Sequence, residues 1–292
     1  MTGNTRQTLR LRIHGVRETA KITHAMELIA AARMRRAEQR AIDARPYAGQ
    51  LAELMRITLG QTASSQEHPF FARPDDGVAL VIHITADKGL CGGLNSRLNH
   101  MLAEFILARG SGVRVITVGR KGRDFALRYH LNLIAEFPGL GDTPSVARLR
   151  PLCRLTRGLF VRGDIDRVYL CYPRYEGVMS QHPTLQQMLP VAAPGTRSEA
   201  PGEAVFEPEP VRFLEHLFVR YVEASVYHAC VEMVASEHSA RMVAMHSATE
   251  SARDLVAEMT VELHRSRQAA VTEEICDVTA GAESLLRGGA HE

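Results

Sequence analysis

Residues 211–286 decide the fold, and they read VRFLEHLFVRYVEASVYHACVEMVASEHSARMVAMHSATESARDLVAEMTVELHRSRQAAVTEEICDVTAGAESLL. This stretch contains no proline, and its only glycine is Gly281. Small or apolar residues recur mostly at steps of three or four, which is the spacing of one helix face. The pattern predicts one helix of about 70 residues, roughly 105 Å long. Such a length without stop signals indicates a coiled coil. The periodic positions are Leu217, Tyr221, Ala224, His228, Val231, Ala235, Met242, Met245, Thr249, Ala252, Val256, Met259, Leu263, Ser266 and Ala270.

A second long helix is predicted over residues 5–58. This segment contains one proline, Pro46, which we expect to bend or interrupt the helix. Its many alanines would allow a partner helix to approach closely. The helical spacing is carried by Leu9, Ile13, Val16, Ala20, Met26, Ala30, Met34, Ala37, Ala41 and Ala44.

The charges of the two ends are complementary. Residues 1–58 hold 11 Lys+Arg and 5 Asp+Glu, a net charge of +6, whereas residues 211–292 hold 7 and 13, a net charge of −6. Exposed ion pairs contribute only about 0–1 kcal/mol each, so charge would set the orientation of the helices while packing supplies their stability. We therefore expect the two terminal helices to lie side by side.

The hydrophobic period changes between these helices. Residues 78–85 (VALVIHIT) predict a buried strand, and a glycine-rich turn at 89–93 follows it. Strands that alternate with helices predict a small α/β domain with a mostly parallel sheet. The further expected strands are 113–118, an apolar stretch at 131–137, and 167–172, and the expected helices are 95–108, 121–130 and 145–161. Residues 173–210, which are rich in Pro, Gly and Ser, are expected to return the chain to the surface.

The predicted fold class is α/β plus a long antiparallel coiled coil, in which the N- and C-terminal helices pair around an inserted small Rossmann-like α/β domain. Because the two helices differ in length, some 16–20 residues around 260–286 would have no partner within the chain. A lone helix of this kind is marginal in water, so we expect other proteins to enclose it. The expected domains are a helix at 1–58, the α/β domain at 77–175 with linkers at 59–76 and 176–210, a helix at 211–286 and a polar tail at 287–292.

The composition of the chain excludes several classes of protein. A net charge of +2 is too small to indicate nucleic-acid binding. The five cysteines are scattered without a C-x-x-C pair, so we expect reduced, mostly structural thiols and no metal site. Since there is no uncharged stretch of about 20 apolar residues, and none of signal-peptide length at the N-terminus, we expect no transmembrane segment and no leader.

The glycine-rich turn raises the question of phosphate binding. Gly89, Gly92 and Gly93 follow a predicted strand and precede a predicted helix. However, they lack both the G-x-G-x-x-G spacing and the lysine-serine/threonine ending of a P-loop. The sequence favours a tight structural turn that needs glycine backbone freedom, and it predicts no catalytic residue and no cofactor. A nucleotide-binding Rossmann-like enzyme stays open as an alternative, as does a diverged coiled-coil scaffold.

Five motifs then point to one family. In chain order they are KITHAMELIAAARM (21–34) with RPYA (45–48), TADKGLCGGLN (85–95), MSQHPTLQQMLP (179–190), SEHSARMVAM (236–245) and RSRQAAVTEE (265–274). Together they resemble the gamma subunits of F-type ATP synthases over nearly the whole chain. The resemblance implies a non-catalytic central rotor shaft that couples rotation of a membrane c-ring to ATP synthesis or hydrolysis on the alpha and beta subunits. It also implies an epsilon-subunit partner and a peripheral position on the cytoplasmic face of a bacterial plasma membrane.

The same resemblance suggests contact residues. Met26 matches a methionine that faces a beta-subunit loop, although ordinary helix packing is an equal alternative. Arg241, Gln268, Thr272 and Glu274 match polar positions that contact the alpha/beta ring through directional, charge-assisted bonds, against the alternative of a solvated helix face. The basic cluster of Arg33, Arg35 and Arg36 would face acidic loops of the beta subunit or remain solvated. The chain departs from the family at Lys88, where arginine is usual, and at Cys276 and Asp277, where threonine and glutamate are often found.

Overall fold

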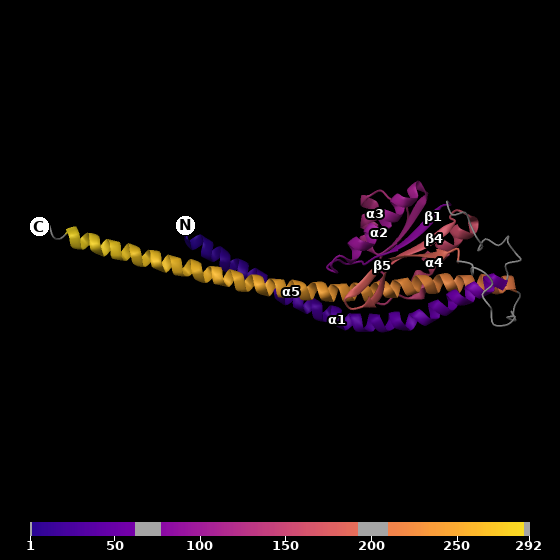
Figure 1. The fold of residues 1–292 in the computed structure, drawn as a ribbon, viewed down its shortest axis with the longest axis horizontal. Coiled ribbons are helices and arrows are strands. Elements are labelled where there is room, and N and C mark those ends of the chain that lie inside the picture. The colour runs from indigo at the N-terminus through magenta and orange to yellow at the C-terminus, as the bar shows by residue number, and fades with distance from the viewer. Residues whose placement is uncertain (1, 62–76, 192–209, 289–292) are drawn as a thin grey trace. The chain divides into compact units, whose positions relative to one another are not determined.

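The computed structural model describes residues 2–61, 77–191 and 210–288 (Figure 1). Contacts divide the chain into two units, which we name the helical unit (residues 1–28 and 245–292) and the sheet unit (residues 29–244). Much of both predicted linkers and the last four residues of the predicted tail lie outside the described residues. The side chains of residues 281–288, including Glu283, are also outside them.

Two long helices begin and end the described chain. Helix α1 spans Thr2–Gln61 and helix α5 spans Pro210–Gly288, with lengths of 60 and 79 residues. The prediction of long N- and C-terminal helices is therefore confirmed. Pro46 lies inside α1 and does not interrupt it. Its ring is exposed, and the adjacent Arg45 ties this part of α1 to α5, so the lost backbone hydrogen bond is tolerated.

The sheet unit contains one five-stranded sheet in the order β3-β2-β1-β4-β5. Strands β1 (Ala79–Ile84), β2 (Val113–Val118), β3 (Leu133–Phe137) and β4 (Arg167–Gly177) are parallel, and β5 (Ser180–Leu189) pairs antiparallel with β4. The helices between them are α2 (Leu94–Arg109), α3 (Arg120–Arg128) and α4 (Val146–Arg162), with a short 3₁₀ turn η1 (Gly110–Gly112) before β2. The predicted mostly parallel sheet is confirmed.

Strand β5 corrects the expectation for residues 173–210. We expected a surface connection there, but β4 continues to Gly177 and β5 occupies ten of the following residues. An edge strand pairs on one side only, so it tolerates a proline such as Pro183 and a run of polar side chains. Because prolines and runs of polar side chains are also typical of loops, the sequence did not predict this strand.

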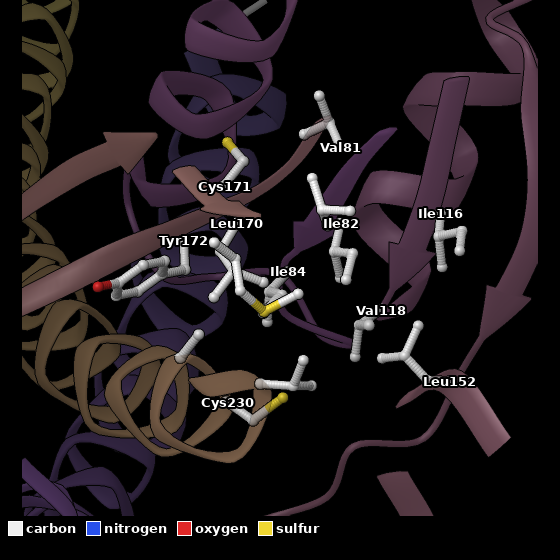
Figure 2. Packing of buried hydrophobic residues seen from close by; sticks show 14 of the residues in the cluster. Val81, Ile82, Ile84, Ile116, Val118, Leu152, Leu170, Cys171, Tyr172 and Cys230 are labelled. Atoms are coloured by element: carbon white, nitrogen blue, oxygen red, sulfur yellow. The ribbon is translucent and has the colours of Figure 1, made fainter. Parts of the chain in front are cut away.

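The core of the sheet unit is layered. Figure 2 shows Ile82, Ile84 and Val118 on the face of the sheet that carries α4 and α5, near Leu152 and Cys230. Alternate residues point to the opposite face, where the Cys171 thiol lies 3.9 Å from the Leu98 carbonyl of α2. Four of the five cysteines are buried, as expected for thiols that act as small hydrophobic groups, and Cys276 is exposed.

Helices α1 and α5 pair antiparallel in both units. In the helical unit, the Thr23 and Thr249 hydroxyls are 2.8 Å apart, and His246 Nδ1 lies 3.0 Å from Glu27 Oε1. In the sheet unit, Arg45 contacts Glu232. In these contacts, a higher residue number on α1 pairs with a lower residue number on α5. The predicted antiparallel orientation is therefore confirmed. The buried alanines Ala30, Ala37 and Ala41 lie on the inner face of α1, as the sequence pattern predicted.

Candidate functional site

Four of the predicted contact residues lie in the helical unit. Met26 is half-buried on α1, so part of its surface is open to contact by another protein. Gln268, Thr272 and Glu274 are exposed on α5. The Thr272 hydroxyl donates a hydrogen bond to the Gln268 carbonyl at 3.0 Å, which satisfies it within the helix. The amide and carboxylate of the other two point to solvent.

The C-terminal part of α5 has no partner among the described residues of the helical unit. Ala270 is the last buried residue, and every residue from 271 to 280 is exposed. Three of these are large and apolar, namely Val271 (45% exposed), Ile275 (59%) and Val278 (72%). An isolated helix that exposes apolar side chains is marginal in water, so this segment is suited to insertion into a surrounding protein.

The other predicted residues lie in the sheet unit, where Arg33 is paired within the chain. Its guanidinium lies 2.7 Å from the Asp142 carboxylate, and Arg40 donates to the Asp142 carbonyl at 3.1 Å. The opposite helix contributes His238, whose Nε2 is 3.1 Å from Asp142 Oδ1. Burial lowers the pKa of His238, and the Asp142 carboxylate opposes that shift. The loop that carries Asp142 therefore contacts α1 and α5 together.

Arg35 and Arg36, the other two members of the basic cluster, are exposed. Neither makes an ion pair with any residue that the structure describes. They form a free basic surface on α1, whereas Arg33 has its charge partly compensated by Asp142.

Arg241 contacts the glycine-rich turn. The sequence suggested a ring contact for Arg241 and a structural role for the turn. The Arg241 side chain is nearly buried, and its Nη2 donates to the Gly89 carbonyl at 3.1 Å and to Glu237 Oε1 at 2.6 Å. Burial raises the pKa of Glu237, and the neighbouring Arg241 opposes this shift. Gly92 has a φ of +57°, which favours glycine, and Gly93 precedes α2. Arg241 therefore fastens the 89–93 turn to α5.

Replacing Arg241 with alanine is expected to loosen this turn. The change removes the hydrogen bonds to Gly89 and leaves the Glu237 carboxylate buried without its cation, which costs about 1–3 kcal/mol. Amide hydrogen exchange of residues 89–94 should become faster, while exchange in β3, which Arg241 does not contact, should be unchanged. Arg253→Ala, at an exposed arginine of the same helix, is the matched control. Unchanged exchange in the turn would show that Arg241 does not hold it.

Sequence reasoning missed a buried ionic network around Glu232. This side chain is fully buried on α5, and its Oε1 accepts a hydrogen bond from Arg45 Nε of α1 at 2.7 Å. Its Oε2 accepts the backbone amide of Tyr175 in β4 at 2.7 Å, and Arg45 Nη2 also donates to the Tyr175 carbonyl. His228 Nε2 lies 3.3 Å from Glu232 Oε1. One carboxylate thus joins both long helices to the sheet.

A signal for this network was present in the sequence. Glu232 stands among the apolar residues Val231, Met233 and Val234, on a part of α5 that is buried on nearly every side. A carboxylate in such surroundings requires a paired cation. The partner could not be named, because Arg45 is 187 positions away in the chain.

The stability of the sheet unit is expected to fall in acid through Glu232. Burial by itself would raise the pKa of Glu232, but hydrogen bonds from His228, Arg45 and the Tyr175 amide outweigh it and hold the pKa below its ordinary value of 4.5. The carboxylate therefore stabilises the fold fully above the unfolded pKa, and this contribution is lost as pH falls through the folded pKa. The free energy of unfolding, measured by urea titration from pH 6 to about pH 3, should fall more steeply for the wild type than for Glu232→Gln. Equal slopes would contradict the assignment.

The carboxyl edge of the parallel strands, where nucleotides bind in related α/β folds, is filled by the chain itself. At the start of α3, the Arg120 amide donates to Asp87 Oδ1 at 3.1 Å, the Lys121 amide to the Ala86 carbonyl at 3.1 Å and the Gly122 amide to Thr85 Oγ1 at 2.8 Å. A phosphate needs these donors, and the Asp87 carboxylate would repel it. The geometry therefore disfavours the nucleotide-binding enzyme that the sequence left open.

Within the described residues, no helix combines the length and the apolar character that a bilayer crossing requires.

The fold and these surfaces define a class of protein. It consists of two long antiparallel helices with an inserted α/β domain. The phosphate-binding edge of this domain is closed, and part of the longer helix has no partner among the described residues. A family model described as ATP synthase matches residues 5–285. The chain belongs to the ATP synthase gamma chain family.

Relatives named ATP synthase gamma chain match this chain over nearly its full length. The chain is 41% identical over 278 residues to the ATP synthase gamma chain of Desulfitobacterium hafniense, covering 95% of this chain and 98% of that one. It is 38% identical to the ATP synthase gamma chain of Dehalococcoides mccartyi, with the same coverage. Among solved structures, a chain from the central stalk and c-ring of the Tetrahymena thermophila mitochondrial ATP synthase is 25% identical with a TM-score of 0.61, covering 78% of this chain and 99% of that one. A chain of the Euglena gracilis mitochondrial ATP synthase shares the fold at 18% identity, with a TM-score of 0.67 and coverage of 99% and 97%.

Proposed function

We propose that this chain is the central rotor shaft of an F-type ATP synthase, a subunit without catalytic residues of its own. Rotation of a membrane c-ring would turn the chain inside a ring of alpha and beta subunits. The subunits of the ring would then pass through different conformations, because each meets a different side of one rotating surface. Membership of the gamma chain family supports this assignment.

The observation that carries the proposal is the exposed segment 271–280 of α5. It continues a helix pair whose inner positions, up to Ala270 on α5, are buried or half-buried, and its own apolar residues are covered by nothing within the described chain. A helix of this kind needs a sleeve of other proteins, and an alpha/beta ring supplies one. The antiparallel pair also suits the transmission of torque, since each helix restrains the bending of the other.

We assign the ring contacts to exposed or half-exposed polar groups. Gln268, Thr272 and Glu274 would contact the ring from α5, and Met26 from α1. Arg35 and Arg36 would face acidic loops of the beta subunit, since their charges are uncompensated among the described residues. Arg241 and Arg33 would act mainly through their bonds to Gly89 and Asp142, which position the surrounding surface.

The remaining assignments concern the α/β domain and the location. The domain at 77–175 would form the foot of the shaft, in contact with the epsilon subunit and the c-ring, while the helices at 1–58 and 211–286 form the shaft. The complex would then place this chain at the cytoplasmic face of a bacterial plasma membrane, held there through the c-ring.

Co-purification with the alpha and beta subunits of the same organism tests the proposal. The chain alone is expected to hydrolyse no ATP, whereas alpha, beta and this chain should form a stable complex that does. Gln268→Ala and Glu274→Ala should lower the hydrolysis rate of that complex, while Glu258→Ala, at another exposed carboxylate of α5, should not. Failure of the chain to enter the complex would contradict the rotor assignment and favour a diverged scaffold.

A further inference from the structure

A pocket in the sheet unit lies away from every residue assigned above. It has a volume of about 680 Å³ and is bounded by the C-terminal part of α1, by α4 and by the first turns of α5. Four arginines line it, namely Arg150, Arg154, Arg157 and Arg220. We name this site the arginine pocket.

The positive charge of the arginine pocket is only partly compensated. Among the described residues, Glu223 is the one carboxylate that lines the pocket, and it lies 3.6 Å from Arg150 Nε and 3.3 Å from Arg220 Nη1. Arg154 and Arg157 make no ion pair with any residue that the structure describes. The described lining residues therefore carry a formal net charge of +3 with His216 neutral.

This arrangement is unfavourable without a ligand. Arg150 and Arg154 are four residues apart on α4, and Arg154 and Arg157 are three apart, so the three like charges lie on one helix face. Like charges at these spacings destabilise a helix. A bound anion would remove the repulsion, and guanidinium groups bind phosphate oxygens through paired, charge-assisted hydrogen bonds.

The arginine pocket also has apolar lining, which we name its apolar wall and which consists of Leu51 and Leu54 of α1 and Phe213 and Leu217 of α5. Leu54 is 39% exposed, so apolar surface remains open to a ligand. A small inorganic anion would use only the cationic wall, whereas an amphiphile with a phosphate head would use both.

We propose that the arginine pocket binds an anionic phospholipid, with the phosphate head on Arg154 and Arg157 and the adjoining apolar portion against Leu51, Leu54 and Phe213. This site is independent of the ring contacts, because it is built from different residues. It would give the chain a direct attachment to a lipid surface in addition to any attachment through partner proteins.

Vesicle binding by the full chain tests this proposal. Vesicles of phosphatidylcholine with phosphatidylglycerol are compared with vesicles of phosphatidylcholine alone, at physiological salt, by co-sedimentation. The wild type is expected to bind only the anionic vesicles. Arg154→Gln with Arg157→Gln should weaken that binding about thirtyfold, which corresponds to about 1 kcal/mol for each arginine near an anionic surface.

The matched control is Arg97→Gln with Arg128→Gln, which removes the same charge from exposed arginines outside the pocket. Its binding should stay within about twofold of the wild type. Leu54→Asn, which changes only the apolar wall, should also weaken binding. Thermal unfolding without lipid checks that each variant is folded.

Three results would overturn the proposal. The first is that the wild type does not bind anionic vesicles. The second is equal weakening by the two arginine pairs, which would indicate general surface charge. The third is displacement of the vesicles by inorganic pyrophosphate together with unchanged binding of Leu54→Asn, which would show that the pocket recognises a free phosphate group and not a lipid.

Discussion

Replacing Glu232 with alanine is expected to destabilise the sheet unit by about 3–5 kcal/mol, because it leaves Arg45 and the Tyr175 amide without their buried acceptor. The carboxylate belongs to α5 and accepts hydrogen bonds from both α1 and β4. Its loss should therefore increase hydrogen exchange in all three elements. The free energy of unfolding from urea titration gives the magnitude, and the exchange pattern gives the location.

A matched control and a double-mutant cycle make this prediction specific. Glu215→Ala, at an exposed glutamate of the same helix, should change stability by no more than about 0.5 kcal/mol. Combining Glu232→Ala with Arg45→Ala should cost clearly less than the sum of the two single changes, since the two residues share one interaction. Additive costs, or a loss confined to α5, would contradict the view that this network joins the helices to the sheet.

Gly119→Ala is expected to be the most damaging glycine substitution in the sheet unit. Gly119 has a φ of +94°, and an added Cβ would lie 2.1 Å from the Thr85 carbonyl oxygen. The new methyl group meets backbone, which cannot move aside as a side chain can. The backbone strain and the clash together should cost at least about 2 kcal/mol in the free energy of unfolding.

Gly112→Ala provides the comparison, because an added Cβ there would meet nothing within 4 Å and its φ is not positive. It should change stability by less than about 1 kcal/mol. Comparable unfolding free energies for the two variants would show that the β2–α3 turn is not pressed against β1. That result would also mean that the carboxyl edge of the sheet has to be considered again as a ligand site.

The parts of the fold that depend on periodicity were predictable from the sequence. The expected inner positions of α5, from Leu217 to Ala270, are all buried or half-buried, and the same holds for α1 from Leu9 to Ala44. Long helices repeat one pattern many times, so a few polar interruptions do not obscure it. Thr23 is such an interruption, and its hydroxyl pairs with Thr249 inside the interface.

Features that depend on a single long-range contact were not predictable. Strand β5 owes its conformation to pairing with β4, and its own residues resemble a loop. The Glu232 network joins residues far apart in the chain. The motif around Arg241 identified this residue as a contact residue. It did not show whether the guanidinium bonds Gly89 in the same chain or a group on another subunit, since both bonds need a guanidinium at that position.

The measurement that tests the rotor account most directly is single-molecule rotation. A probe is attached to the sheet unit through Leu107→Cys, an 82% exposed position, with the exposed Cys276 changed to serine. The alpha/beta complex is then fixed to a surface and supplied with ATP. The account predicts that the probe turns in one direction for as long as ATP is hydrolysed. A probe that stays stationary while the same labelled complex hydrolyses ATP would contradict it.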